Sequence, residues 1–295
     1  MSKRARLVFL FTALLMSATS VSAMPFFFST GNPDGLIATA SRPSGTSLIG
    51  IESADDFALS QNTSISSATF TGLLTGGASP ADIASVGVEI YRVFPQDSDL
   101  SRTSGAPVFG TTQVPTRVNS PSDTSFALRD SIAGTLSFSV TLLTSSFTVN
   151  KSVKDGGINP TPNQTTGGDG SVTGDEVQFD ISFTTPIDLA ADHYFFVPQV
   201  ALTVGDFLWL SAPKPIVPPG TPFAPDLQSW IRDDNLSPDW LRIGTDIVGG
   251  APAPTFNAAF SLTGDTGSIP EPDSLALFTL GVFGLRMTRC RGLAA

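Results

Sequence analysis

Cysteine and histidine are scarce in this sequence of 295 residues. There is one cysteine, Cys290, so no intramolecular disulfide can form. There is one histidine, His193, so no zinc or iron site based on several histidines or thiolates can be built. A Ser-His-Asp triad would need His193 as its base, yet the sequence has no nucleophile-elbow pattern. We therefore predict no catalytic residue and a protein that is not an enzyme.

Charged residues are also few, at 14%, against roughly 25% in an average soluble domain. Their balance is acidic, with a formal net charge of −10. No basic stripe is available to neutralise phosphates, so a nucleic-acid partner is excluded. With 41% hydrophobic residues the chain is too apolar for a disordered stalk. The composition is typical of a soluble protein that works outside the cell.

Helical periodicity is missing from the interior of the sequence, and short strand-like segments recur in its place. The strand-like segments are 64–74, 85–94, 124–128, 135–149, 177–184, 193–202, 206–210 and 256–262. In 177–183 every second residue is apolar, which is typical of a strand with one buried face. Glycine and proline turn signals separate the segments. The pattern predicts an all-β fold, a jelly-roll-like antiparallel β-sandwich, over residues 24–268.

Three parts of this body stand apart from the strands. Short helical turns are predicted at 80–84 and at 226–231. A stretch rich in glycine and proline, 151–174, is either a long loop or a joint between two halves. We favour the loop, because both flanking segments resemble half-buried strands.

The first 23 residues have the three parts of a secretory signal peptide. Basic residues at Lys3, Arg4 and Arg6 precede an apolar run over 7–16, and small residues end at Ala23. The apolar run is too short to span a bilayer, which takes about 20 residues. We therefore predict export across the inner membrane through the secretion translocon, with cleavage after Ala23.

The last 27 residues have a second ordered arrangement. The motif Pro270-Glu271-Pro272 precedes an apolar run over 275–285, and three arginines follow, which are Arg286, Arg289 and Arg291. Segment 269–295 resembles the PEP-CTERM sorting signal of Gram-negative bacteria. That resemblance implies processing by an exosortase, a membrane-embedded transpeptidase. The prolines would hold the motif extended, and the arginines would keep the end of an apolar helix on the cytoplasmic side.

The body also resembles a group of PEP-CTERM proteins that is defined by its sorting tail rather than by a known activity. The resemblance rests on Ser53-Ala54-Asp55-Asp56-Phe57, on segment 88–95, and on segment 230–244 with Pro238-Asp239-Trp240. It implies no activity for the body.

Acidic residues supply the candidates for metal binding and hydrolysis. Asp169, Asp175 and Asp180 fall near the spacing of a calcium loop, and segment 97–99 is a second candidate, so calcium is the one cation considered. The adjacent pairs 55–56 and 233–234 could serve a hydrolase. Neighbouring side chains on a strand point to opposite faces, however, so adjacency does not bring two acids together.

Tryptophans supply the remaining binding candidates. Trp209 lies in an apolar run and is predicted to be in the core. Trp230 and Trp240 lie among charged residues and prolines, so we predict that both are exposed and can stack on sugar rings.

Together these features favour an exported, non-catalytic cell-surface or extracellular-matrix protein, tethered transiently to the membrane by its tail. A carbohydrate-binding module that uses Trp230 and Trp240, with an exopolysaccharide as its partner, is the alternative. A secreted hydrolase is the third possibility.

Overall fold

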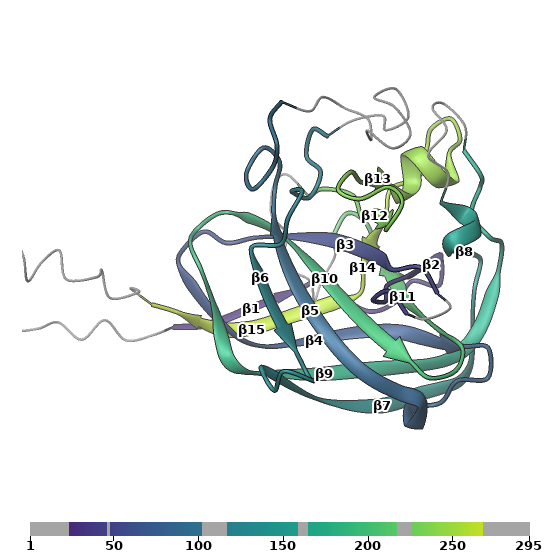
Figure 1. The fold of residues 1–295 in the computed structure, drawn as a ribbon, viewed down its shortest axis with the longest axis horizontal. Coiled ribbons are helices and arrows are strands. Elements are labelled where there is room, and N and C mark those ends of the chain that lie inside the picture. Colours follow the sequence, from purple (N-terminus) through teal and green to yellow (C-terminus); the bar gives the residue numbers. More distant parts are fainter. Residues whose placement is uncertain (1–23, 46–47, 102–116, 159–164, 217–225, 268–295) are drawn as a thin grey trace, which may run out of the picture.

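The computed structural model describes residues 24–45, 48–101, 117–158, 165–216 and 226–267, which form two β-sheets that lie face to face (Figure 1). Signal residue Ala23 and the tail motif lie outside the described residues. Consecutive strands repeatedly change sheet, as in a sandwich. The predicted all-β sandwich is confirmed.

The larger sheet has nine strands. Along its main path they are β1 (Met24–Ser29), β15 (Phe260–Thr266), β4 (Thr63–Thr75), β11 (Asp206–Ala212), β2 (Ile37–Ala40) and β8 (Lys151–Val153). Three further strands join this path: β9 (Val172–Leu189) pairs with β4, β7 (Leu136–Val149) pairs with β9, and β14 (Asn257–Ala258) pairs with β11. All pairs are antiparallel except β2 with β8, which are parallel, so the sheet is mixed rather than wholly antiparallel.

The smaller sheet has six strands, in the order β13 (Leu241–Arg242), β12 (Trp230–Asp233), β3 (Ile51–Ala58), β10 (His193–Leu202), β5 (Ile83–Arg92) and β6 (Ala127–Asp130). Three short helical segments complete the described fold: 3₁₀ turns at Pro80–Asp82 and Asp155–Gly157, and a π-helix at Ile243–Val248. No helix within the described ranges is long and apolar enough to cross a membrane.

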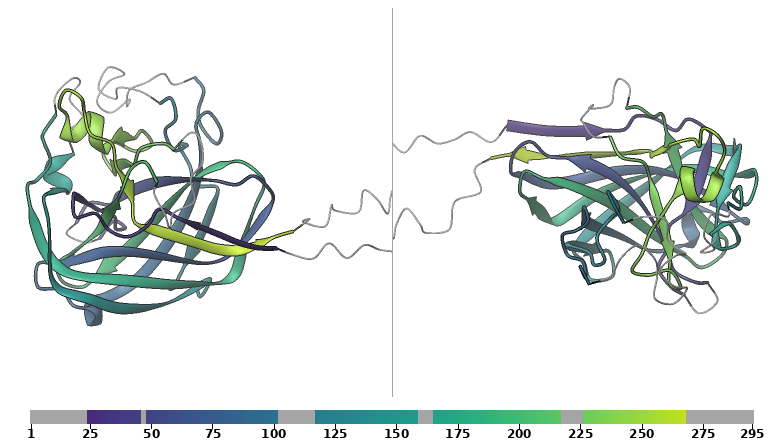
Figure 2. Two further views of the ribbon diagram at one scale, coloured as in Figure 1. Left: turned by 180° about the vertical axis from the view of Figure 1, so that it is seen from behind. Right: turned by 90° about the horizontal axis from the view of Figure 1, so that it is seen from above.

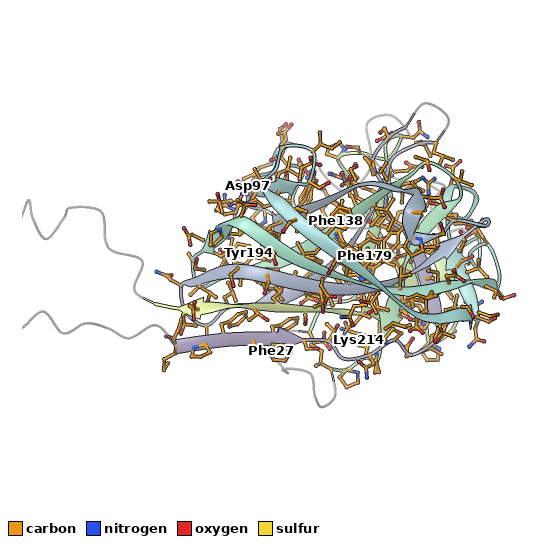
Figure 3. The ribbon with its side chains drawn as sticks, turned by 90° about the horizontal axis from the view of Figure 1, so that it is seen from below. Phe27, Asp97, Phe138, Phe179, Tyr194 and Lys214 are labelled. Carbon is orange, nitrogen blue, oxygen red and sulfur yellow. The ribbon has the colours of Figure 1, made fainter. Side chains whose placement is uncertain are left out.

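Aromatic side chains fill the space between the two sheets (Figure 3). Phe70 stacks on Phe179 with ring centroids 4.6 Å apart, and Phe196 stacks on Phe260 at 5.0 Å. Trp209 is 1% exposed and donates its indole N–H to the carbonyl of Ala259, as the core prediction requires. Burying large aromatic rings of this kind is the main stabilising contribution available to a chain without disulfides.

A second apolar layer covers the outer face of the six-stranded sheet, the face turned away from the nine-stranded sheet. It contains Tyr91, Phe195, Trp230 and Trp240. Trp230 is 1% exposed and Trp240 is 2% exposed. The prediction of exposed tryptophans is therefore wrong. The charged and proline-rich segments around them fold over the sheet and bury the rings, so a charged neighbourhood in the sequence did not mean a surface position.

Two local predictions have different outcomes. The turn predicted at 80–84 is present as the 3₁₀ turn Pro80–Asp82, in which Ser79 and Asp82 form a capping box. The turn predicted at 226–231 is wrong, because β12 begins at Trp230 and pairs with β3 there. Stretch 151–174 connects β7 and β9, which pair with each other in one sheet, and it contributes β8 on the way.

The first and last described strands lie side by side and run out of the fold together (Figure 2). Met24, at the start of β1, pairs with Thr266, at the end of β15. The segments that precede and follow the described fold therefore leave it at one place.

Candidate functional site

A polar cleft of about 230 Å³ opens on the outer face of the six-stranded sheet. Side-chain alternation places its residues there. Phe57, Val88 and Phe196 belong to the core between the sheets, so residues an odd number of positions away in the same strands, such as Glu52, Glu89 and Gln199, point outward. The polar residues that line the cleft include Glu52 on β3, Glu89 on β5, Gln199 on β10, and Arg232, Asp233 and Asp234 at the end of β12.

Two carboxylates that line this cleft meet at one buried phenol beneath it. The hydroxyl of Tyr91 donates to Oε2 of Glu89 at 2.5 Å, and the same oxygen lies 3.3 Å from Oε2 of Glu52. Arg232 joins the group from β12, donating from Nε to Glu52 at 2.5 Å and from Nη2 to the Tyr91 oxygen at 2.8 Å. Strand register explains the meeting, because Arg232 is directly opposite Glu52 in the β12–β3 pair.

Arg232 also ties the sheet to the segments that cover it. Its Nη1 donates to the main-chain carbonyls of Asp123, at 3.2 Å, and Pro238, at 3.1 Å. Its guanidinium carbon lies 4.2 Å from the ring centre of Trp240 and 5.1 Å from that of Tyr91. A planar group with five donors can satisfy all these partners at once, whereas an ammonium cannot.

Burial raises the pKa of Glu89, and the neighbouring charge of Glu52 raises it further. Burial likewise raises the pKa of Tyr91, so its phenol stays protonated and keeps donating. Glu52 is held as an ion pair by Arg232, while Glu89 is held in an environment that favours its protonated form. Two carboxyl groups in unlike environments are the arrangement from which an acid–base pair can be built.

The adjacent aspartates of both predicted pairs mostly hold the backbone in place. Asp234 lines the cleft, yet its Oδ2 accepts from the Ser44 hydroxyl at 2.6 Å and from the Gly50 amide at 2.8 Å. Asp233 accepts from the Leu236 amide at 2.8 Å, which closes a turn after β12.

Asp55 and Asp56 are both buried on β3 and point to opposite sides of the strand, as expected for neighbours. Asp55 accepts from the Ser229 hydroxyl at 2.9 Å and from the Ala258 amide at 2.8 Å. Burial raises its pKa well above the usual range, and the charge of Asp56 adds to this. These contacts fasten the segment before β12, and β14, to the centre of the sandwich, which accounts for the burial of Asp55.

His193 is paired with Asp56, at 2.5 Å between Nε2 and Oδ2. Burial raises the pKa of Asp56, and the hydrogen bond from His193 opposes that rise. The hydroxyl of Ser229, which is bonded to the neighbouring Asp55, donates to that carboxylate and to the carbonyl of Phe256, at 2.9 Å each. The contacts of Ser229 are thus those of a structural serine, and do not supply a nucleophile for His193.

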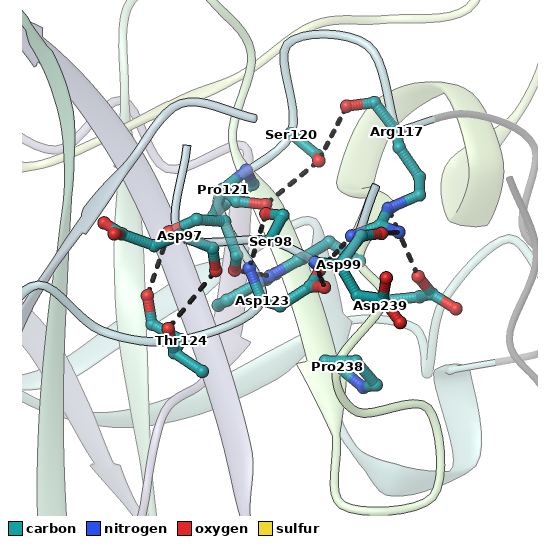
Figure 4. A network of polar contacts seen from close by, with 12 residues as sticks. Asp97, Ser98, Asp99, Arg117, Ser120, Pro121, Asp123, Thr124, Pro238 and Asp239 are labelled. Atoms are coloured by element: carbon teal, nitrogen blue, oxygen red, sulfur yellow. Dashed lines mark hydrogen bonds and ion pairs between the residues drawn. The ribbon is translucent and has the colours of Figure 1, made fainter. Parts of the chain in front are cut away.

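The acidic segment 97–99 is organised around arginines (Figure 4). Asp97 pairs with Arg92. Arg117 reaches the carbonyl of Asp99 at 3.3 Å, pairs with Asp123, and lies 3.6 Å from Asp239. A guanidinium therefore occupies the centre of this acidic group, where a cation would otherwise be expected.

The three aspartates predicted to bind calcium do not come together. Asp175 and Asp180 lie five positions apart on β9, so they point to opposite faces of that strand. Asp169 precedes the strand and accepts from the amide of Lys154 at 2.6 Å. Within the described ranges, no group of three or more histidine, cysteine or acidic residues is placed to hold a metal ion.

We did not predict from the sequence that Glu52, Glu89, Tyr91 and Arg232 form one site. A signal was available in segment 88–95, where Glu89 and Tyr91 alternate with Val88 and Ile90 and so share one face. Nothing in the sequence shows that Glu52 and Arg232, which are 180 positions apart, are paired across two strands.

Comparisons with known proteins identify the tail rather than the body. A family model described as the PEP-CTERM protein-sorting motif matches residues 268–291. The chain is therefore of the class that carries a C-terminal protein-sorting signal. That signal makes it a PEP-CTERM protein, and it implies export, processing by an exosortase-type membrane enzyme, and a cell-surface or extracellular location with a C-terminal membrane anchor. No curated protein and no solved structure matches the chain.

Proposed function

We propose that this exported protein is a non-catalytic component of the cell surface or of the extracellular matrix. The observation that carries the proposal is the match of residues 268–291 to the PEP-CTERM protein-sorting motif. The described body adds a rigid sandwich with a doubly covered sheet.

The contacts in the polar cleft support a structural role for its charged groups. Arg232 makes contacts to Glu52, to Tyr91 and to two main-chain carbonyls, and its ring neighbours enclose it. An arginine used in this way holds segments together, and mutation of one partner of such a buried pair mainly affects folding.

The test compares cells that produce the wild-type chain with cells that produce a variant in which Pro270, Glu271 and Pro272 are all alanine. We expect the wild-type protein at the surface or in the matrix, and the variant held in the membrane fraction or released unsorted. A matched control replaces the exposed Asp265, just before the tail, with asparagine and should behave as the wild type. Identical distribution of all three proteins would refute the sorting role.

A secreted hydrolase is the second candidate, because two carboxylates meet in the cleft. In that case Glu89 would act as the acid and Glu52 as the carboxylate that attacks or stabilises the reacting carbon. The purified protein would then release reducing ends from polysaccharides, and Glu89→Gln and Glu52→Gln would each abolish this activity. We expect no release by the wild-type protein. The carbohydrate-binding alternative has lost its supporting observation, because Trp230 and Trp240 are buried.

A further inference from the structure

Strand β7 leaves one side of the larger sheet open. It is 14 residues long, and among the described residues it pairs with β9 alone. Its sequence, LSFSVTLLTSSFTV, contains no charged residue and no proline. The outer side of such a strand presents a row of backbone N–H and C=O groups that can pair with another strand.

The other strands at the sheet ends, apart from the two-residue β14 (Asn257–Ala258), carry residues that discourage such pairing. These are Pro25 in β1, Lys151 in β8, Arg242 in β13, and Arg129 with Asp130 in β6. Proline and charge are the usual means by which sheet edges are kept from joining. The longest edge of the molecule is therefore the one that lacks them.

Apolar side chains on β7 itself remain exposed. Leu142 and Leu143 are each 48% exposed. Phe138 and Val140 pack against the core and are only partly covered, with Phe138 6.5 Å from Phe179 between ring centres (Figure 3). An additional strand paired with β7 would cover the exposed parts of Phe138 and Val140.

The regular part of β7 is complementary to itself. Pairing with β9 is regular over 136–142, and irregularities follow at Leu143 and before Phe147. In an antiparallel pair of two identical strands related by a two-fold axis at Ser139, Leu136 faces Leu142, Ser137 faces Thr141, and Phe138 faces Val140. Residues that face each other in this way lie on the same side of the sheet.

We propose that two copies of this protein associate through β7, in antiparallel register about Ser139, to form one sheet that continues across both molecules. Phe138 and Val140 of each copy then cover each other on the core side, and the serines and threonines meet on the outer side. The partner strand belongs to a second copy of the protein because residues 136–142 have the same order of polar and apolar residues when read in either direction. The absence of charge matters as well, because each copy has a net charge of −10 and repels the other elsewhere. The irregularities after Leu142 end the paired segment, as bulges do at natural edges.

The experiment uses the full chain with Cys290→Ser and measures mass by sedimentation equilibrium over a range of concentrations. We expect a reversible dimer. The variant Ser137→Lys with Thr141→Lys places lysines opposite each other twice, and its dissociation constant should rise by at least about tenfold. The matched variant Ser137→Lys with Thr141→Glu places opposite charges together twice and should stay dimeric. Ser137 and Thr141 are both exposed, so thermal melts of the two variants should coincide at a protein concentration low enough for both to be monomeric.

A cysteine at Ser139 gives a second readout that does not depend on charge. It would face its own copy within the 4.4–6.8 Å Cα separation that a disulfide accepts, so mild oxidation should yield a covalent dimer. Val204→Cys, on the exposed turn between β10 and β11, is the matched control and should remain monomeric on a denaturing gel. A protein that is monomeric at every concentration, or a dimer that is indifferent to the charge at 137 and 141, would overturn the proposal.

Discussion

Arg232 is the residue on which most contacts of the outer sheet face converge. It is buried and joins β12 to Glu52 on β3, to Tyr91 on β5 and to the main chain of the covering segments. Removing it would leave Glu52 and two carbonyls without their donor. We predict that Arg232→Ala lowers the free energy of unfolding by about 3–5 kcal/mol. Arg232→Lys should recover only part of this loss, because an ammonium cannot reach all four acceptors.

Urea denaturation followed by circular dichroism measures both variants. Lys151→Ala, which removes an exposed positive charge from β8, is the control and should change stability by less than about 0.5 kcal/mol. A similar small effect from Arg232→Ala would show that the network does not stabilise the fold.

Glu89 gives the cleft a pH dependence whose sign can be stated. Its pKa is higher in the folded than in the unfolded protein. Its contribution to stability is therefore complete below the unfolded pKa and is lost as the pH rises through the folded pKa. We predict that Glu89→Gln stabilises the protein at neutral pH, by up to about 1 kcal/mol, because the amide can still accept from Tyr91.

The gain should shrink as the pH falls towards 4 and vanish below it, as Glu89 becomes protonated in both states. Melting temperatures between pH 4 and 8 give the comparison, and the exposed carboxylate Asp265, changed to asparagine, should reproduce the wild-type profile. A gain that is the same at every pH would contradict the assignment of the effect to this carboxyl.

Burial of the tryptophans has a spectroscopic consequence. Each of Trp209, Trp230 and Trp240 is at most 2% exposed. We predict native emission at short wavelength with little quenching by iodide, and a red shift with strong quenching only in denaturant. Added oligosaccharides should leave the native emission unchanged. Quenching that depends on a saccharide would restore the idea of a stacking surface.

Whether the sequence predicts a given strand depends on whether one face of that strand or both faces are buried. The bounds predicted for β10 agree with the structure, and β4, β7 and β11 begin or end close to prediction, because polar and apolar residues alternate in them or form bounded runs. The predicted segment 177–184 covers only the middle of β9. β3 and β12 escaped prediction because both of their faces are covered and their polar residues are buried in hydrogen bonds and ion pairs. Polar and apolar residues need not alternate in a strand whose two faces are both covered, so that pattern cannot identify such a strand.

Candidate sites were harder to predict than strands, for a related reason. Trp230 and Trp240 were predicted at the surface from their sequence neighbours, whereas tertiary pairing places Trp240 under Arg232. Asp55 and Asp56 were considered only as an adjacent pair, and tertiary pairing places Asp55 beneath β14. The acids that do meet in a cleft, Glu52 and Glu89, come from strands that are neighbours only through β10. The residue types in the sequence indicated acidic chemistry, whereas the pairing register of the strands determines which acidic groups meet.

Strand β1 offers a paired test of how the first described strand contributes to the fold. Phe28 is 1% exposed and lies among Phe57 and Phe260, with ring centres 6.1 and 5.3 Å away. The preceding Phe27 is 54% exposed. We predict that Phe28→Ala costs about 3–5 kcal/mol of stability, because it leaves a cavity between the sheets.

Phe27→Ala is the matched control on the other face of the same strand, and it should cost less than about 1 kcal/mol. Chemical denaturation of both variants decides. Equal losses would mean that β1 is held by its backbone pairing with β15 rather than by its inward side chain.

For the molecule as a whole, the sorting signal begins where the described fold has already closed. β15 ends at Thr266, opposite Met24 at the start of β1, and the matched motif spans 268–291. The chain therefore has a body whose strands are all paired before the tail, and a tail whose motif is read by a membrane enzyme. The two parts can be separated by truncation if the tail contributes no strand or core residue to the sandwich.

We predict that deleting 269–295 leaves the melting temperature of the body unchanged and leaves export intact. Location should change, from the surface-associated fraction towards free protein in the medium, because the anchor that retains the protein during processing is lost. A thermal melt of the purified truncated protein and fractionation of cells that carry each form measure the two effects separately. A large fall in melting temperature would place the tail within the core, and an unchanged distribution would show that surface retention depends on the body, for which the self-complementary edge of β7 would then be the first region to mutate.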